Sequence, residues 1–147
     1  MIKKLIVMRA LPGSGKSTYV SKLPNPCVCS IDSYFYRNGV WEWKEDELSE
    51  AWKHCDVQFS IFMDRRKRTI VLDNVNSKIS DFIRYVVRAK SEGYQVSIVE
   101  ILERNLEMLA SRGKHSLTVE RLQQISDEWE EIPPDFADFH IKLDGNS

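Results

Sequence analysis

The chain has 147 residues, of which 42% are hydrophobic and 29% are charged, and its formal net charge is -1 at pH 7. This length suits one domain over residues 1–147 that buries roughly two-thirds of its unfolded surface. The near-neutral charge argues against a strongly basic nucleic-acid-binding domain, although it allows a local basic patch. No apolar run approaches the ~20 residues that span a bilayer, so we expect no membrane partner.

The cysteines and the N-terminal segment bear on the compartment. Cys27, Cys29 and Cys55 are odd in number, and their spacing fits neither a zinc site nor a Cys-x-x-Cys redox pair. We therefore expect small buried side chains in a reducing cytoplasm. The first apolar stretch is too short for a signal peptide, and Arg9 interrupts it, so a first strand is the better interpretation.

The predicted elements alternate along the chain. The predicted strands are 3–9, 27–31, 69–72, 95–102 and an edge strand at 139–143. The predicted helices are 16–23, 45 to about 66, 77 to about 92, 105–111 and 118 to about 131. Prolines at 24 and 133 and Gly93 mark helix ends. This alternation predicts an α/β fold, with a parallel sheet of about five strands and helices on both faces.

The segment after the first strand matches the phosphate-binding loop pattern Gly-x-x-x-x-Gly-Lys-[Ser/Thr], except that Ala10 replaces the first glycine. Its residues are Pro12, Gly13, Ser14, Gly15, Lys16, Ser17 and Thr18. The glycines allow the loop to wrap a pyrophosphate with its N–H groups. Lys16 can reach the β- and γ-phosphates and the Ser17 hydroxyl can bind Mg²⁺, so ATP and Mg²⁺ are the expected cofactors. A turn that binds nothing is disfavoured because lysine and serine follow in register.

Two aspartates follow later strands. Ligands of parallel sheets bind at the carboxyl ends of the strands, which gathers Gly13, Asp32 and Asp73 at one rim. We expect Asp32 to orient an acceptor hydroxyl and take its proton, and Asp73 to help hold Mg²⁺. The alternative for each is an aspartate that caps a turn. Asn74 and Asn76 are as well explained by a polar turn as by contacts with substrate.

Several cationic side chains are candidates to stabilise the charge on the transferred phosphoryl group. Arg112 lies in a segment between two helices, where a lid can place a cation on developing charge, and Arg104 is a second candidate. The cluster at 65–68 ends the long helix, where cations suit the helix dipole. A phosphate-tracking patch is the less favoured alternative for that cluster.

Aromatic residues surround the acceptor side. Trp41 and Trp43 could stack on a base, but packing is the favoured role. Tyr34, Phe35 and Tyr36 follow Asp32 closely and are better placed to touch an acceptor. Packing and substrate contact are evenly balanced for these three residues.

The chain resembles the 5′-kinase domain of bacteriophage polynucleotide kinase and related small P-loop kinases. The matching segments, in order, are 12–18, 30–34, 71–76, 103–105 and 112–115. The resemblance implies a P-loop NTPase-type sheet with a short lid, Asp32 as the catalytic base and Arg112 as the lid arginine. That family has an arginine three positions after the base, where this chain has Phe35; Arg37 is nearby but out of register. The chain has no room for the phosphatase half of the bifunctional enzyme.

These observations predict an ATP- and Mg²⁺-dependent kinase that phosphorylates a hydroxyl of a nucleic acid or nucleotide. A close variant accepts a hydroxymethylated base in DNA, gripped by aromatic side chains. A second alternative is a small-molecule or nucleoside monophosphate kinase. A third is an ATP-binding module without catalysis, which keeps Lys16 but needs no base.

Overall fold

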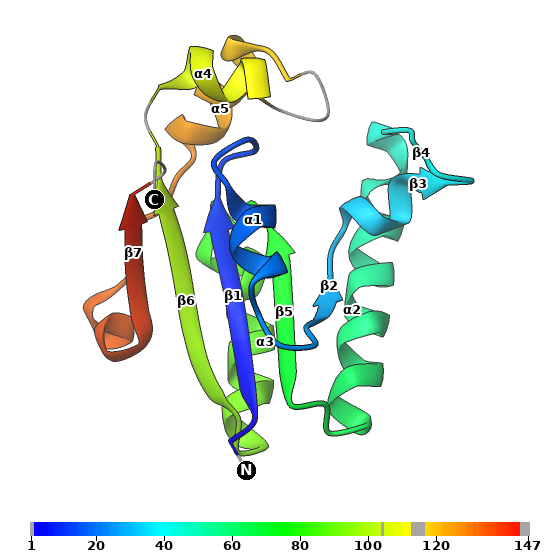
Figure 1. The fold of residues 1–147 in the computed structure, drawn as a ribbon, viewed down its shortest axis with the longest axis vertical. Coiled ribbons are helices and arrows are strands. Elements are labelled where there is room, and N and C mark those ends of the chain that lie inside the picture. Colours follow the sequence, from blue (N-terminus) through cyan, green and yellow to red (C-terminus); the bar gives the residue numbers. More distant parts are fainter. Residues whose placement is uncertain (1, 104, 113–116, 145–147) are drawn as a thin grey trace.

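A computed structural model describes residues 2–103, 105–112 and 117–144. It confirms the α/β prediction: five parallel strands form one sheet in the order β2-β5-β1-β6-β7 (Figure 1). The strands are β1 (Lys4–Ala10), β2 (Cys27–Cys29), β5 (Thr69–Asn74), β6 (Gln95–Leu102) and β7 (His140–Asp144). The order reverses at β1, and ligands of open parallel sheets bind at such a reversal.

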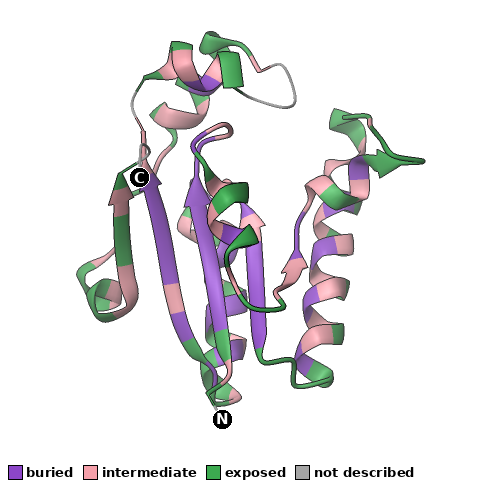
Figure 2. Ribbon diagram, in the orientation of Figure 1, coloured by how far each residue is buried: buried purple, intermediate pink, exposed green. Residues whose placement is uncertain are grey.

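The core lies on both faces of the sheet because alternate side chains of each strand point to opposite sides. Leu5 and Val7 of β1 join one buried cluster, while Ile6 and Met8 join the other. The same alternation in β5 sends Leu72 to the first cluster and Val71 to the second. Figure 2 shows the central strands buried along their length, as expected for a sheet covered on both faces.

Helices cover the two faces unequally. The helices are α1 (Lys16–Ser21), α2 (Leu48–Asp64), α3 (Ile79–Ser91), α4 (Leu106–Arg112) and α5 (Val119–Asp127). Buried residues of α2 and α3 form the larger cluster, and α1 contributes to the smaller one on the opposite face (Figure 1). None of the helices in the described ranges is long and apolar enough to cross a membrane.

The helices α4 and α5 form a small lid beyond the carboxyl ends of β1 and β6 (Figure 1). The lid has a core of its own, in which Leu109 and Leu122 pack with Leu11 of the loop after β1. Thr118 caps α5 by accepting a hydrogen bond from the N–H of Arg121 at 3.1 Å. The lid is therefore anchored directly on the phosphate loop by apolar contacts.

Several element boundaries differ from the sequence prediction. The long helix begins at Leu48 because a 3₁₀ turn, η2 (Glu45–Glu47), precedes it. The last strand begins at His140, since η3 (Pro134–Phe139) occupies the start of the expected range. A two-stranded hairpin, β3 (Tyr36–Arg37) and β4 (Val40–Trp41), was not predicted. Its turn is Asn38-Gly39, with φ of 53° and 80°, which is a standard sequence signal for a tight hairpin.

Candidate functional site

The phosphate loop has the geometry that its sequence predicts. Gly13 and Gly15 have φ of +86° and +96°, in the region that favours glycine. Between them, Ser14 folds inward, and its Oγ donates a hydrogen bond of 2.6 Å to the carbonyl of Leu11. The loop then enters α1 at Lys16. A loop of this conformation presents successive backbone N–H groups to an anion.

The position of Ala10 explains why an alanine can replace the first glycine of the loop pattern. It is the last residue of β1, is fully buried against β6 and does not have a positive φ. A glycine is needed only where φ is positive or where a Cβ would clash. The alanine side chain instead joins the apolar cluster under α1, so the substitution is compatible with the loop.

Lys16 and Asp73 meet across the site. The Lys16 Nζ lies 3.5 Å from Asp73 Oδ1, and both side chains are largely buried, at 15% and 20% exposure. That oxygen is buried and accepts no hydrogen bond from any described residue. A carboxylate oxygen left in this way beside the loop fits a role toward a bound cation or its water shell. No group of three or more His, Cys, Asp or Glu side chains capable of holding a metal occurs within residues 2–103, 105–112 and 117–144.

Asp73 and Asn74 are adjacent, yet they serve different parts of the molecule. Asp73 lies on the α1 side of β5, whereas Asn74 lies on the α2 side, as strand alternation requires. The Asn74 Oδ1 accepts a hydrogen bond of 2.9 Å from the N–H of Ile31, and its amide points to the Cys55 sulfur at 3.7 Å. The Asn74 side chain therefore links β5 to the end of β2 and does not face the phosphate loop.

Asn76 also has a structural role. It is 2% exposed, its φ is 54°, and its amide donates a hydrogen bond of 2.7 Å to the carbonyl of Met8. Asparagine tolerates this left-handed conformation better than most residues. Asn76 therefore stabilises the turn after β5, whereas Asn74 is the last residue of β5 and its side chain links that strand to the end of β2. Contact of either side chain with substrate stays a hypothesis.

Asp32 lies at the expected rim. It opens the 3₁₀ helix η1 (Asp32–Phe35) at the carboxyl end of β2, and it is partly buried. The next residue, Ser33, is held by its Oγ, which lies 3.0 Å from His54 Nε2 and donates to the Ser30 carbonyl at 2.9 Å. Because β2, β5 and β1 are adjacent and parallel, the loop, Asp73 and Asp32 share one edge of the sheet. The structure brings these predicted residues to one rim.

The aromatic residues after Asp32 mostly pack on one another. Phe35 is 1% exposed, and its ring centroid lies 4.5 Å from that of Trp43. Trp43 in turn stacks with Trp41 at 6.0 Å. Packing is thus the correct role for Phe35, which is too buried to touch an acceptor. Tyr36 remains 47% exposed on the hairpin.

Glu47 holds the hairpin side together, and sequence reasoning did not single it out. Its Oε1 accepts hydrogen bonds from the Tyr34 hydroxyl at 2.7 Å and from Arg37 at 2.8 Å. The Tyr34 hydrogen bond, followed by Arg37, lowers the pKa of the Glu47 carboxyl. The same bond raises the pKa of Tyr34. Arg37 is therefore engaged in an ion pair on the surface.

The lid touches the phosphate loop at Gly13. A Cβ built at this position would lie 2.7 Å from the backbone oxygen of Leu109 in α4, so only glycine fits. Arg112 ends α4 and is exposed on the lid, three residues after Leu109. Residues 113–115 of the matching segment, and the second candidate Arg104, lie outside the described residues.

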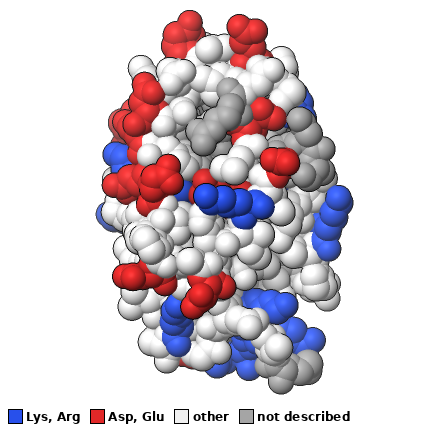
Figure 3. All heavy atoms as spheres, turned by 90° about the vertical axis from the view of Figure 1, so that its left-hand side faces the viewer, with Lys and Arg blue, Asp and Glu red and all other residues white. Residues whose placement is uncertain are grey.

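The cluster at 65–68 lies at the opposite end of the sheet. The carbonyl of Arg68 accepts a hydrogen bond from the N–H of Lys4, where β1 begins. Arg66 pairs with Glu92 at 3.6 Å. These residues are remote from the phosphate loop, which is at the other end of β1. Figure 3 shows the β7 side, with acidic side chains at the lid end, basic ones at the far end and both kinds across the middle.

The cysteines behave as the composition predicts. Cys29 and Cys55 are fully buried, and Cys27 is partly buried. Burial raises the pKa of the Cys29 and Cys55 thiols, which keeps them protonated and poorly nucleophilic.

The fold and the loop define a small P-loop protein with a kinase-type architecture. The chain belongs to the AAA domain family, whose model matches residues 5–121. It is 27% identical over 158 residues to human YLP motif-containing protein 1 and 26% identical over 133 residues to human NEDD4-binding protein 2, covering 88% and 86% of this chain. It is 33% identical over 103 residues to rat 2′,3′-cyclic-nucleotide 3′-phosphodiesterase, covering 67% of this chain. The chain spans only 7%, 8% and 24% of the lengths of these relatives.

Solved structures share the fold. A gluconokinase from Sinorhizobium meliloti 1021 is 16% identical with a TM-score of 0.60, over 99% of this chain and 85% of that one. Kti12 from Chaetomium thermophilum, in complex with ADP-AlF3, is 15% identical with a TM-score of 0.61, over 95% and 88% of the two chains. A chain of the Pnkp1/Rnl/Hen1 RNA repair complex is 20% identical with a TM-score of 0.57, over 90% and 48%. These likenesses confirm the P-loop kinase fold; the finer resemblance, to the bacteriophage enzyme, stays a prediction.

Proposed function

We propose that the protein is an ATP- and Mg²⁺-dependent kinase that phosphorylates a hydroxyl of a nucleotide or nucleic acid. The observation that carries this proposal is the pair of Lys16 and Asp73, 3.5 Å apart beside a phosphate loop of the right conformation. Asp32 lies on the same rim, at the end of the outer strand β2. A cation, a loop of amides and two carboxylates at one sheet edge are the groups that phosphoryl transfer requires.

The residues divide the chemistry between them. Lys16 and the loop N–H groups hold the β- and γ-phosphates, while Ser17 and Asp73 are the groups that would hold Mg²⁺. When bound, this ion neutralises charge on the phosphates. Asp32 orients the acceptor hydroxyl. As the bond from the γ-phosphorus to the β,γ-bridging oxygen breaks, a bond to the acceptor oxygen forms, ADP leaves, and the hydroxyl proton passes to Asp32. Arg112 stabilises the charge on the transferred group from the lid.

The nucleic-acid or nucleotide acceptor is supported by two of the relatives. One structural neighbour belongs to an RNA repair complex, and one curated relative is named for its action on cyclic nucleotides. The first shares the fold of this chain, and the second shares its domain. We infer a nucleic-acid or nucleotide acceptor from these two relatives. The exposed Tyr36 on the hairpin gives this side a surface on which a base could stack.

A small-molecule acceptor is a second candidate, and the charge of the acceptor side favours it. Exposed carboxylates cluster around the hairpin and the start of α2; they are Glu42, Glu45, Asp46 and Glu50. The cations there, Arg37 and Lys44, are both paired with Glu47. Such a surface repels a long polyanion more than a small or uncharged acceptor. One structural neighbour, the gluconokinase, is named for a small substrate.

The test is a screen with labelled ATP and Mg²⁺. The acceptors are 5′-hydroxyl oligonucleotides, duplexes with and without a 5-hydroxymethyl pyrimidine, nucleosides and their monophosphates, and sugar acids. Transfer to a hydroxyl of an oligonucleotide, nucleoside or nucleotide supports the proposal, and transfer to the modified duplex alone identifies the base as acceptor. Transfer to the phosphate of a nucleoside monophosphate supports a nucleoside monophosphate kinase instead. Transfer to sugar acids alone supports the second candidate.

The variant Asp32→Asn separates a kinase from a module that only binds ATP. In a kinase, it lowers the transfer rate by about 100- to 10,000-fold, because a positioned base contributes about that much, while the Kd for ATP stays within threefold. Asp64→Asn, exposed at the far end of α2, is the matched control and retains full transfer. If folded protein with Mg²⁺ transfers phosphate to no acceptor and yet binds ATP, the module interpretation replaces the proposal.

A further inference from the structure

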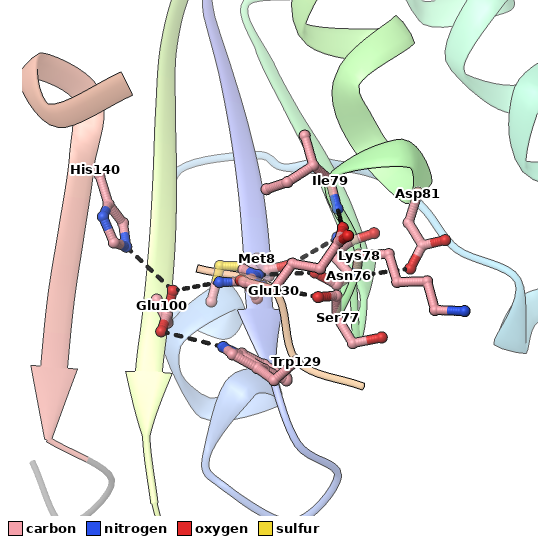
Figure 4. Close-up of polar contacts among 11 residues, drawn as sticks. Met8, Asn76, Ser77, Lys78, Ile79, Asp81, Glu100, Trp129, Glu130 and His140 are labelled. Carbon is pink, nitrogen blue, oxygen red and sulfur yellow. Dashed lines mark hydrogen bonds and ion pairs between the residues drawn. The ribbon is translucent and has the colours of Figure 1, made fainter. Parts of the chain in front are cut away.

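A fully buried arginine lies beside the phosphate loop without belonging to it. Arg9 is 0% exposed, next to the last residue of β1. Its Nε donates to the carbonyl of Asn76 at 2.8 Å, and its two terminal nitrogens donate to Glu100 Oε1 and to the Ser77 carbonyl, also at 2.8 Å. The second terminal nitrogen also donates to the carbonyl of Glu130. Figure 4 shows the partners converging from β6, from the turn after β5 and from the segment after α5.

The contacts of Arg9 reach into the lid. Its guanidinium carbon lies 4.3 Å from the ring centroid of Trp129. Trp129 packs against the lid cluster that contains Leu109 and Leu122. Its indole N–H donates to Glu100 Oε2 at 3.4 Å (Figure 4). Both partners of the buried ion pair therefore contact the same ring. Arg9 thus joins the strand that leads into the phosphate loop to the segment that leads out of the lid.

The segment leaving the lid is tied down by further bonds. The N–H of Glu130 donates to the carbonyl of Ser77 at 2.8 Å. The Glu130 carboxylate accepts a hydrogen bond of 2.6 Å from the N–H of Ile79, at the start of α3. This side of the lid is therefore fixed to the turn after β5 and to the start of α3.

The segment that enters the lid also makes contacts within itself. There, the N–H of Asn105 donates to Glu103 Oε1 at 2.9 Å, and Asn105 Oδ1 caps α4 through the N–H of Met108 at 3.1 Å. These contacts are local along the chain. A pocket of about 20 Å³, lined by Glu103, Ser126 and Trp129 among others, separates the entering and leaving segments.

A buried ion pair is a poor source of stability, because removing two charges from water costs as much as their attraction returns. Geometry is the better reason to keep one. The planar guanidinium can donate in several fixed directions and stack on a ring at once, which a lysine cannot do. Arg9 uses all of these capacities, with partners on three separate segments.

We propose that Arg9 is a positioning residue, which fixes the leaving end of the lid so that α4 and α5 carry Arg112 at a set place over the phosphate loop. Arg9 acts through the lid and touches no nucleotide. The inference rests on the proposed function for its effect on catalysis. Its effect on the lid stands apart from catalysis and can be measured in the protein alone.

The experiment compares wild-type protein with Arg9→Lys, which keeps the charge but loses the planar donor set. In hydrogen–deuterium exchange, amides of 106–112 and 119–127 exchange at least fivefold faster in the variant, while those of β1 and β5 change less than twofold. The kcat for transfer falls about tenfold, and the KM for ATP stays within twofold. Arg88→Lys is the matched control, because Arg88 also makes several hydrogen bonds, to Ser60, Asp64 and Glu92, but far from the lid.

A double variant separates positioning from general damage. If Arg9 acts through the lid arginine, Arg9→Lys costs less than twofold in kcat when Arg112→Ala is already present. Additive losses, or unchanged exchange in the lid, overturn the proposal. If Arg9→Lys does not fold, Trp129→Leu removes the stacked ring and leaves the ion pair; it must give the same faster exchange confined to the lid, and unchanged exchange counts against the proposal. Absence of transfer in the wild-type protein refutes the proposed function alone, since the exchange result stands without it.

Discussion

The two sides of the site are built by opposite means. On the nucleotide side, Arg9 and Glu100 form an ion pair in which the arginine is 0% exposed and the glutamate 8%. On the proposed acceptor side, Arg37 and Glu47 form a pair of the same length, 2.8 Å, but with 49% and 25% exposure. Exposed ion pairs are screened by solvent and contribute little, whereas loss of one partner of a buried pair is strongly destabilising. The nucleotide side is therefore held in one geometry, and the acceptor side is free to change.

This difference indicates where specificity resides. The phosphate loop, Asp73 and the lid contact use buried groups and positive φ angles, which tolerate few substitutions. The hairpin is short, exposed and joined to α2 mainly through Glu47. Changes in the hairpin should alter the choice of acceptor without altering ATP binding.

The largest expected effect is on the nucleotide side. Lys16→Ala should lower kcat/KM by about 100- to 1,000-fold, because it removes a cation from the developing charge. The Kd for ATP with Mg²⁺, measured by calorimetry, should also rise. Lys22→Ala, just beyond α1, is the control and should behave as wild type. Unchanged affinity and turnover in Lys16→Ala would refute the phosphate-loop assignment.

The next effect concerns the cation. Asp73→Asn should raise the Mg²⁺ concentration that gives half-maximal transfer by about 10-fold, because an amide oxygen binds Mg²⁺ less tightly than a carboxylate. The measurement is a Mg²⁺ titration at saturating ATP. Asp64→Asn, at the far end of α2, should leave the titration unchanged. A titration of Asp73→Asn that superimposes on the wild type would remove Asp73 from the metal site.

A smaller effect tests the contact between loop and lid. Gly13→Ala should lower the free energy of unfolding by about 1–3 kcal/mol, because the position has a positive φ and the new Cβ would meet the Leu109 carbonyl oxygen. Gly39→Ala is a matched control with φ of +80° and nothing within 4 Å of the new Cβ. Chemical denaturation of both variants isolates the clash from the backbone strain. Equal losses would show that α4 does not press on the loop in solution.

The smallest effect is on the acceptor side and depends on pH. The folded-state pKa of Glu47 lies below its ordinary value of 4.5. Its stabilising contribution is therefore present above pH 4.5 and is lost as the pH falls through the lowered pKa. Glu47→Gln should lower the melting temperature slightly at pH 7, and the difference from wild type should shrink below pH 4.5. The KM for the acceptor should change while the KM for ATP does not. A constant difference down to pH 3 would show that the carboxylate is not what ties the hairpin.

Sequence patterns predicted the conformation of the phosphate loop and the position of the two aspartates, because these features are set by local sequence. Glycines, a lysine and a hydroxyl in fixed spacing specify the loop, and apolar strands ending in aspartate place Asp32 and Asp73 at one rim. The strands themselves were predictable because buried parallel strands have continuous apolar runs.

The other features depend on contacts between distant segments. In the sequence, Arg9 interrupts an apolar stretch and carries no other signal, yet its partners lie 67, 91 and 121 residues away. The hairpin could have been found, since Asn38-Gly39 is a turn signal in the sequence. Its attachment through Glu47 could not, because a glutamate ten residues past Arg37 carries no pattern that marks it.

Strand β5 places neighbouring residues in different layers, and this limits how the strand can vary. Moving its frame by one residue would carry the Asp73 carboxylate into the apolar layer beside Cys55 and leave the uncharged Asn74 amide facing Lys16. Single-residue insertions and deletions within 69–74 should therefore abolish both folding and catalysis. Conservative apolar substitutions at Ile70 or Val71 should retain both. A screen of all substitutions, insertions and deletions in this strand should recover folded protein with many substitutions and with almost no insertion or deletion.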